Sequence, residues 1–553
     1  MTRGLRELYR EEFAHYRLAT FRHDFFAGCT VAAVALPLAL AFGVASGASA
    51  AAGLVTAIVA GLVIGLLSGA PYQISGPTGA MTAVLVVLAQ KYGLSGVWIA
   101  GLLSGVCLLG LGLLRLGRFI AFIPAPVVTG FTSGIALIIA IGQFDHVLGI
   151  QTGASESAAR KLAGYFAGGL HPNPAAIGLA AIVIAIMLAW PRRWNARFPA
   201  SLLGLVIATV LAARLRWPVE TIGAIPQTLR LQARLGWNHI PWANLGDFVL
   251  PALTITALGA IESLLCGTVA SNMTGIRLGA NQELIAQGVG NVVLPFLGGV
   301  PATAAIARTS VGIKSGGRTR VTGIVHALVL LASMFVLAPV MSHVPLAALA
   351  GVLLVTAWRM NEWESIHFIF GRRFKTAMAT FLVTMVATVV LDLTQAILIG
   401  VVLSGALFMS QISRMDIEVQ DVDADKLRQR GIQLAGDCRG VRVAYVTGPL
   451  FFAAVGHFNQ AFAHEQATRV LILSMRGAPL MDTSGLQALS TLHERMQARG
   501  GRLMLAGLHP QVRAMVQRSG LLDRLGADNV YWSADQAIAA ASAVAPIPVH
   551  AAI

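Results

Sequence analysis

Arg308 is the residue of this chain most suited to binding an anion, because it lies in a stretch that is otherwise small and apolar. The stretch is GGVPATAAIARTSVGI, residues 298–313. A charge near the middle of a bilayer costs about 2.5–3.5 kcal/mol on insertion scales. Glu262 lies in similar surroundings, LGAIESLLCG. Charges kept in such places usually line a transport path, so we expect Arg308 to attract an anion and Glu262 to act beside it.

Two apolar stretches are interrupted by Gly and Pro in comparable ways. They are YQISGPTGAMTAV at 72–84 and GGVPATAAIARTSV at 298–311, and Pro77 and Pro301 lie 224 positions apart. Matching breaks in two halves of a membrane chain are typical of inverted-repeat transporters, which bind their ligands at the midplane. Each stretch is expected to run extended and then start a half-helix. The free N–H groups and positive dipole end of such a helix attract anions.

The expected site therefore consists of the two breaks facing each other, Ser75 to Met81 against Thr303 to Thr309. The same 224-residue spacing pairs Glu262 with Leu38. The alternative is that the breaks only kink helices and that Arg308 belongs to an inner loop. The expected substrate-binding residues are Ser75, Gly76, Pro77, Thr78, Gly79, Ala80, Thr303, Ala304, Ala305, Ala307 and Arg308.

The composition places most of the chain in a membrane. Its 553 residues are 56% hydrophobic and only 12% charged, against about 25% charged in soluble proteins. The net charge of +15 fits cytoplasmic loops rich in Lys and Arg better than a nucleic-acid partner, and none is expected. The four cysteines are scattered, without CxxC spacing, so neither a disulfide framework nor a metal site is expected. No motif indicates an enzyme or a cofactor.

Fourteen apolar stretches are candidate spans, several of them too short to cross a bilayer unaided. An even count and the positive-inside bias place both termini in the cytoplasm. The expected domains are a cytoplasmic N-terminal segment (1–24), a transport domain (25–413), a charged linker (414–437), a small α/β domain (438–545) and a tail (546–553). The spans are expected near 25–46, 50–69, 73–91, 95–114, 124–148, 174–190, 200–215, 248–271, 283–297, 303–315, 321–340, 345–357, 376–391 and 395–412.

The segment after the linker alternates strand and helix patterns. VRVAYV, RVLILSM and RLMLAG predict buried strands, and LQALSTLHERMQARG predicts an amphipathic helix. The loop MDTSGLQAL, 481–489, precedes this helix. Its residues favour a helix start, with Asp482, Thr483 or Ser484 as N-cap.

Several stretches together resemble the sulfate permease family, the bacterial relatives of solute carrier family 26, from about residue 22 to 540. ALPLALAFGVASGASAAAGL is similar to the first span of that family and ISGPTGAMTAV to its third. GFTSGIALIIAIGQ is similar to the fifth span and LGAIESLLCGTVASNMTG to the eighth. PATAAIARTSVGIKSGGRTRVTGIV is similar to the tenth. The C-terminal pattern resembles a STAS domain, which in related anti-sigma-factor antagonists carries a phosphorylatable Ser at the position of Ser484.

The resemblance implies an all-α membrane fold of fourteen spans in two inverted repeats of seven. It implies a core domain (spans one to four and eight to eleven), a gate domain (spans five to seven and twelve to fourteen) and an elevator-like movement. The anion would lie between short strands of spans three and ten, with Arg308 drawing it in and Glu262 as the eighth-span acid. It further implies a homodimer in the bacterial inner membrane, with a cytoplasmic STAS domain open to a protein partner.

Two departures from the family bear on the substrate and on coupling. Leu38 replaces a Gln common in sulfate and chloride carriers, so the first span looks closer to bicarbonate and dicarboxylate carriers. Glu262 and Cys266 stand where the sodium-dependent bicarbonate branch has Asp and Thr, and that branch tends to lack the Arg. We therefore expect proton coupling or exchange of bicarbonate or sulfate, with Glu262 taking up a proton as the anion binds. The alternatives are a C4-dicarboxylate/proton symporter, a passive anion channel, and a structural Glu262–Arg308 salt bridge.

Overall fold

The structure is a computed structural model. It describes residues 5–117, 124–150, 171–191, 194, 198–239, 242–391, 393–413, 415–429, 431–436, 438–463 and 468–543. The expected tail, 546–553, lies outside these residues. The chain divides within α18 into two compact units, Met1–Val402 and Leu403–Ile553. Each unit is described by itself.

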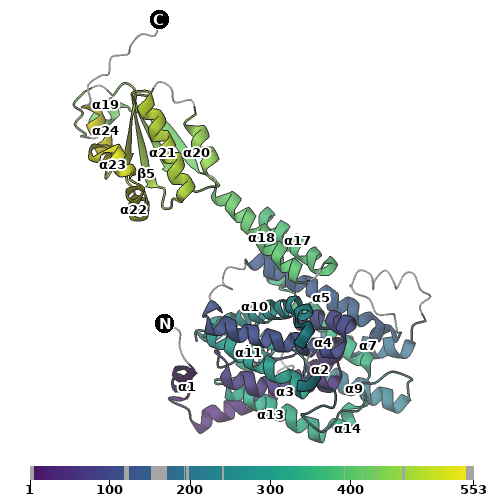
Figure 1. The fold of residues 1–553 in the computed structure, drawn as a ribbon. Helices are drawn as coiled ribbons and strands as arrows, with labels where there is room; N and C mark the ends of the chain where they lie inside the picture. Colours follow the sequence, from purple (N-terminus) through teal and green to yellow (C-terminus); the bar gives the residue numbers. More distant parts are fainter. Residues whose placement is uncertain are drawn as a thin grey trace. The chain divides into compact units, whose positions relative to one another are not determined.

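The first unit is helical apart from two very short strands (Figure 1). Its first half contains α1 (Leu5–Phe13), α2 (Leu18–Ala45), α3 (Ala50–Leu67), β1 (Ser75–Gly76), α4 (Gly79–Leu113), α5 (Ala125–Leu148), α7 (Pro174–Ala189) and α9 (Ala200–Leu215). After the 3₁₀ turns at Trp237–His239 and Trp242–Phe248 follow α10 (Val249–Thr274), α11 (Ala280–Leu297), β2 (Thr303–Ala304), α12 (Ile306–Lys314) and α13 (Val321–Val336). The unit ends with α14 (Ala338–Met341), α15 (Leu346–Met360), α16 (Trp363–Gly371), α17 (Lys375–Val390) and the start of α18 (Leu393–Ile412).

Each expected span contains a helix, although the stretches 73–91 and 303–315 begin with β1 and β2. Among the described residues, five helical segments are long and apolar enough to cross a membrane: Leu18–Ala45, Ala50–Leu67, Gly79–Leu113, Ala125–Leu148 and Leu245–Thr274. Six shorter apolar helices accompany them. The mostly helical fold expected from the sequence is therefore confirmed.

The structure corrects several boundaries. The helix that contains the first span begins at Leu18, before the expected start at 25, because the polar residues before Phe25 continue the helix. The third and fourth spans share α4, which bends at Gly93, where φ is +69°. The stretch expected as 321–340 divides into α13 and α14 at Leu337, and α16 is a helix that the hydrophobic pattern did not predict.

Segments from the two halves of the chain pack against each other. Helix α13 contacts α2 and α3, and α11 contacts α3 and α4, as Figure 1 also shows for α2, α3 and α13. The backbones of α2 and α3 approach so closely that a Cβ on Gly53 would lie 2.0 Å from the carbonyl oxygen of Ala39. Glycine at this crossing lets the two helices meet, as small residues do in membrane proteins.

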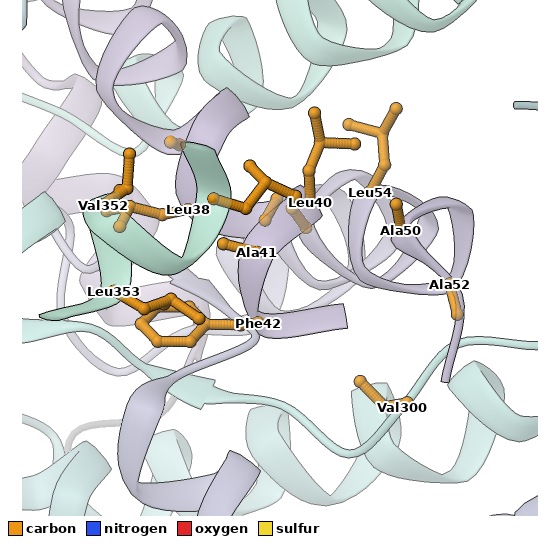
Figure 2. Packing of buried hydrophobic residues seen from close by; sticks show 14 of the residues in the cluster. Leu38, Leu40, Ala41, Phe42, Ala50, Ala52, Leu54, Val300, Val352 and Leu353 are labelled. Atoms are coloured by element: carbon orange, nitrogen blue, oxygen red, sulfur yellow. The ribbon is translucent and has the colours of Figure 1, made fainter. Parts of the chain in front are cut away.

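A buried apolar cluster joins α2 to its neighbours directly behind the broken segments. Figure 2 shows Leu38, Leu40, Ala41 and Phe42 of α2 near residues of α3 and α15. Ala41 and Leu40 are fully buried. This packing holds α2 in place beside the segment before β2. The other labelled residues are Ala50, Ala52, Leu54, Val300, Val352 and Leu353.

The second unit is a five-stranded sheet covered by helices, in the order β3-β4-β5-β6-β7. Strands β4 to β7 are parallel, and β3 pairs antiparallel with β4 at the edge. The predicted strands and amphipathic helix are present as β4, β5, β6 and α21. The elements are β3 (Asp416–Asp421), α19 (Ala424–Gln429), β4 (Val441–Thr447), α20 (Val455–Ala461), β5 (Val470–Gly477), α21 (Thr483–Ala498), β6 (Arg502–Ala506), α22 (Pro510–Arg518), α23 (Leu521–Leu525), β7 (Val530–Tyr531) and α24 (Ala534–Ser542).

The segment 414–437, expected to be a linker, contributes β3 and α19 to this unit. The side chains of β3 alternate between exposed and half-buried. An edge strand with one solvated face can carry many charges. Its composition therefore looks like that of a linker although its backbone is paired along its whole length.

Candidate functional site

The two broken segments meet through a short antiparallel ladder between β1 and β2. Ser75 pairs with Ala304 and Gly76 with Thr303, and the amide of Ala305 donates to the carbonyl of Ile74 (2.9 Å). The short strands expected in spans three and ten are thus present. Their pairing satisfies backbone groups that would otherwise be unpaired far from water.

A helix starts directly after each strand, so two helix N-termini lie at the ladder. Helix α4 begins at Gly79, with Thr78 as N-cap accepting from the amide of Met81 (3.4 Å). Helix α12 begins at Ile306, after the extended Ala305, which offers no side-chain cap. The free N–H groups of these first turns, with the positive dipole ends, favour negative charge nearby.

Arg308 is buried within the first turn of α12, with 2% of its surface exposed. Its Nη2 donates to the carbonyl of Pro77 (2.8 Å). Its Nη1 is buried without a hydrogen-bond partner among the described residues. A Cβ on Gly76 would lie 2.6 Å from Nη1, so any larger residue at position 76 would clash with the guanidinium. A buried donor without a partner is costly, which indicates a place for an acceptor that the protein itself does not supply.

Glu262, on α10, is held beside the ladder by two hydroxyls. Its Oε2 accepts from Thr303 (2.6 Å) and from Thr78 (2.9 Å). The two hydroxyl oxygens also lie 3.0 Å apart. No ion pair joins Glu262 to Arg308 within 4.0 Å, although both residues are described. The alternative of a direct structural salt bridge is therefore wrong for this conformation.

A cavity of about 360 Å³ opens beside these groups. Eight of the residues expected around the site line it: Pro77, Thr78, Gly79, Ala80, Glu262, Ala305, Ala307 and Arg308. Leu38 and Phe42 of α2 and residues of α5 and α10 form its apolar walls. A mostly apolar cavity with a few convergent polar groups is the usual form of a small-ligand site.

Four of the expected residues lie behind this cavity rather than on its wall. Ser75, Gly76, Thr303 and Ala304 form the paired strands and are not among the lining residues. Ser75 and Ala302, the residue before β2, bond instead to side chains of α11. Thr303 still reaches the cavity, through its bond to Glu262.

The cavity wall supplied by α15 and the residues after it was not expected from the sequence. Thr356, Arg359, Met360, Asn361 and Glu362 line the cavity. The hydroxyl of Thr129 donates to Glu362 (3.0 Å). A signal was present, because Arg359, Asn361 and Glu362 lie at the end of an apolar helix, but such residues are also ordinary for an inner loop.

The spacing of the repeat also needs correction. The strands begin at Ser75 and Thr303, which are 228 positions apart. Pro77 follows its strand whereas Pro301 precedes its own, so the two prolines are not equivalent. The helices that follow begin at Gly79 and Ile306, 227 positions apart, so neither pair of elements supports a spacing of 224 or the pairing of Glu262 with Leu38.

In the second unit, Ser484 lies in the first turn of α21. The N-cap is Asp482, whose carboxylate accepts from the amide of Gly485 (2.8 Å) and from the amide of Phe452 (3.0 Å). Of the three N-cap alternatives, the structure therefore selects Asp482. Ser484 is half-buried beside it.

Comparisons with known proteins agree with this architecture. The sulfate permease family matches residues 21–387, and the STAS domain matches residues 437–537. YvdB of Bacillus subtilis, a provisionally assigned sulfate transporter, is 33% identical over 95% of this chain and 98% of its own. The bicarbonate transporter BicA of a Picosynechococcus strain is 30% identical over 95% of both chains.

Solved structures give the same result. The transmembrane domain of a cyanobacterial BicA is 29% identical, with a TM-score of 0.61, and covers 70% of this chain and 98% of that chain. Murine Solute Carrier 26 family member A9 in the inward-facing state is 19% identical, with a TM-score of 0.81 over 93% and 90% of the two chains. That second likeness concerns the fold alone. The family consists of membrane transporters of anions, not enzymes. This chain therefore belongs to the sulfate permease family and carries a C-terminal STAS domain.

Proposed function

We propose that this protein is a secondary active transporter of a small oxyanion, bicarbonate or sulfate, which binds in the cavity between β1, β2 and Arg308. The observation that carries the proposal is the buried Nη1 of Arg308, which has no partner among the described residues. Arg308 lies in the first turn of α12, and its Nη1 lies beside Gly76. An oxyanion there would accept from this nitrogen and from the free N–H groups of α4 and α12.

Access to the site alternates, in this proposal, by an elevator-like movement of the core domain against the gate domain. The cavity is bounded on one side by Phe42, Gly79 and Arg308 from the core and on the other by Phe131 and Met360 from the gate. A site shared between two bodies can open to either side when they shift. The protein works as a homodimer in the bacterial inner membrane, with both termini in the cytoplasm. The STAS domain is available there to a protein partner.

Glu262 couples transport to protons in this proposal. Its Oε2 and the hydroxyls of Thr78 and Thr303 make three oxygen–oxygen contacts. Two hydroxyls supply only two protons for three hydrogen bonds. A proton on Glu262 would supply the third. Loading of an anion beside a carboxylate favours such a proton, since like charges nearby disfavour the ionised form.

Sodium is the less suitable coupling ion. Cys266, one turn after Glu262, presents a buried thiol that donates to Thr309 (3.3 Å). A hard cation prefers oxygen ligands over sulfur. Arg308 already supplies the positive charge that a bound cation would bring.

Uptake into proteoliposomes tests the function directly. Bicarbonate, sulfate, chloride and fumarate are offered in turn, with imposed pH and sodium gradients. Accumulation of bicarbonate or sulfate driven by an inward acid gradient, or by exchange, supports the proposal. Preference for fumarate supports a dicarboxylate symporter instead. Uncoupled current without accumulation supports a channel.

A further inference from the structure

Helix α11 carries three buried polar side chains on one face, none of which lines the cavity. Glu283, Gln287 and Asn291 follow each other at intervals of four residues and are at most 1% exposed. Residues four apart in a helix lie above one another. Burying a polar side chain is costly unless it is hydrogen-bonded. The hydrogen-bond partners of these three side chains therefore indicate which part of the structure each one stabilises.

Glu283 binds the segment that leads into β1. Its carboxylate accepts from the hydroxyl of Ser68 (2.6 Å), the amide of Gly69 (3.0 Å) and the side chain of Gln73 (3.0 Å). Gln287 is the fourth donor (2.8 Å). No cation pairs with Glu283 within 4.0 Å among the described residues, so these four donors alone satisfy it.

Gln287 connects Glu283 to the first strand. Its amide nitrogen has two protons, one directed at Glu283 and one at the hydroxyl oxygen of Ser75 (2.9 Å). Turning the amide over would place its oxygen against the carboxylate of Glu283. The carboxylate therefore fixes the amide in the orientation that holds Ser75.

Asn291 holds the second strand with a pair of bonds. Its side-chain nitrogen donates to the carbonyl of Ala302 (2.9 Å), and its oxygen accepts from the amide of the same residue (2.8 Å). Ala302 directly precedes β2. Helix α11 is therefore hydrogen-bonded to both strands, to β1 through Gln287 and to the start of β2 through Asn291.

We propose that Glu283, Gln287 and Asn291 are positioning residues that set the relative placement of β1 and β2, and through it the affinity for the anion. The placement matters because Arg308 in α12 bonds to Pro77 at the end of β1. A small shift of one strand would move the guanidinium away from the N-terminus of α4. The proposal rests on the function proposed above for the cavity. An ordinary packing role for the three side chains is the alternative.

The test compares two identical substitutions on α11. Gln287→Met has nearly the same length and volume but cannot hold Ser75. Gln282→Met is the matched control, since Gln282 donates to Leu67 of α3 (2.8 Å) and not to a strand. Gln287→Met loses the hydrogen bonds to Ser75 and to Glu283, and we expect it to raise the KM for the transported anion about tenfold, which corresponds to about 1.4 kcal/mol. The maximal rate per folded transporter should stay within about twofold, and Gln282→Met should change neither quantity.

Two results would overturn the proposal. One is an unchanged KM in Gln287→Met with less folded protein or a lower maximal rate, which is the signature of packing alone. The other is an equal change in Gln282→Met. Ser75→Ala removes only the acceptor, and combining it with Gln287→Met should add nothing to the KM of either single variant. Fully multiplicative effects would show that Gln287 does not act through Ser75.

Amide hydrogen exchange gives a readout without any anion. Exchange at 75–81 should be faster in Gln287→Met, and not in Gln282→Met, than in the unaltered protein. If Gln287→Met does not fold, amide exchange at 75–81 is measured in Ser75→Ala instead. Exchange as slow as in the unaltered protein would then count against the proposal. Failure of the unaltered protein to transport an oxyanion would count against the proposed function alone.

Discussion

Arg308 and Glu262 line the same cavity, yet they form no ion pair. Arg308 bonds instead to the carbonyl of Pro77, and Glu262 to two threonine hydroxyls. Direct pairing would leave neither charge available to a ligand. Keeping the charges apart allows an anion to lie beside the arginine while the carboxyl responds to its arrival.

Substitution of Arg308 tests the anion site. Arg308→Ala should abolish uptake or raise the KM at least tenfold, because the charge and two donors are lost from a buried site. Uptake and the amount of folded protein are measured in parallel. Arg277→Ala, which removes an exposed arginine, is the matched control. Normal transport by folded Arg308→Ala would make Arg308 irrelevant to the anion.

A second variant alters the position of the Arg308 guanidinium while keeping its charge. Gly76→Ala places a methyl group 2.6 Å from Nη1 of Arg308 and 3.3 Å from the Cα of Ala57. The guanidinium must then move. We expect a higher KM from this single methyl, whereas Gly65→Ala, where a Cβ meets no atom within 4 Å, should transport normally.

Introduced cysteines can map which residues face the anion. Ala307 is exposed to the cavity, whereas Ala304 is fully buried behind it. In a background with Cys29 and Cys107 replaced by serine, Ala307→Cys should react with a polar thiol reagent, and saturating substrate should slow that reaction. Ala304→Cys should react hardly at all. Equal rates at the two positions, or no protection by substrate, would contradict the location of the site.

The sequence revealed the breaks, the buried charges and the strands of the STAS domain because each has a local signal. Arg308 is the only charge in residues 298–313, and a Gly-Pro pair disfavours an uninterrupted helix. The strand pairing of Ser75 with Ala304 carries no such signal. It was expected only through the family resemblance, since two-residue strands are too short for any periodicity.

Tertiary packing explains what the sequence could not reveal. Polar residues such as Gln287 and Asn291 look like ordinary helix residues until their partners in distant segments are known. Asp24 likewise was expected to be the last residue of the polar N-terminal segment. It is fully buried and accepts from the amides of Arg318 and Thr319, which is why α2 extends beyond the apolar stretch.

The N-terminal helix should contribute measurably to stability. Glu12 is bonded to the amide and to the side chain of Arg320 (2.6 and 2.8 Å), and both side chains are at most 4% exposed. Removing one partner of a buried pair costs about 3–5 kcal/mol. Glu12→Gln should therefore lower the melting temperature, measured by thermal unfolding in detergent, much more than Glu7→Gln on the same helix. Equal melting temperatures would mean that α1 is not docked in solution.

The STAS domain should lose stability in mild acid through His493. Burial, with a smaller contribution from the nearby Arg524 guanidinium, lowers the pKa of His493 below its usual range. The folded state therefore favours the neutral ring. Its contribution to stability is present above about pH 6.5, the ordinary pKa, and declines as the pH falls below that value. Hydrogen-exchange protection of α21 should drop between about pH 7 and 5. His493→Leu should flatten this dependence, whereas exposed His457→Gln should not.

The carboxyl of Glu262 should carry the coupled proton. In the ring formed by Glu262, Thr78 and Thr303, three contacts share two hydroxyl protons unless the carboxyl carries a third. Glu262→Gln imitates the protonated form, because an amide offers both a donor and an acceptor in nearly the same shape. The variant should still bind the anion and exchange it across the membrane.

What Glu262→Gln should lose is the response to a pH gradient, since no proton can leave the amide. Counterflow of labelled anion should remain within about threefold of the unaltered protein, while accumulation driven by an inward acid gradient should disappear. Glu362→Gln, at the other side of the cavity, separates this effect from a general loss of negative charge and should keep proton-driven accumulation. Full proton-driven accumulation by Glu262→Gln, or uptake by the unaltered protein that requires sodium, would show that the carboxyl of Glu262 is not the coupling group.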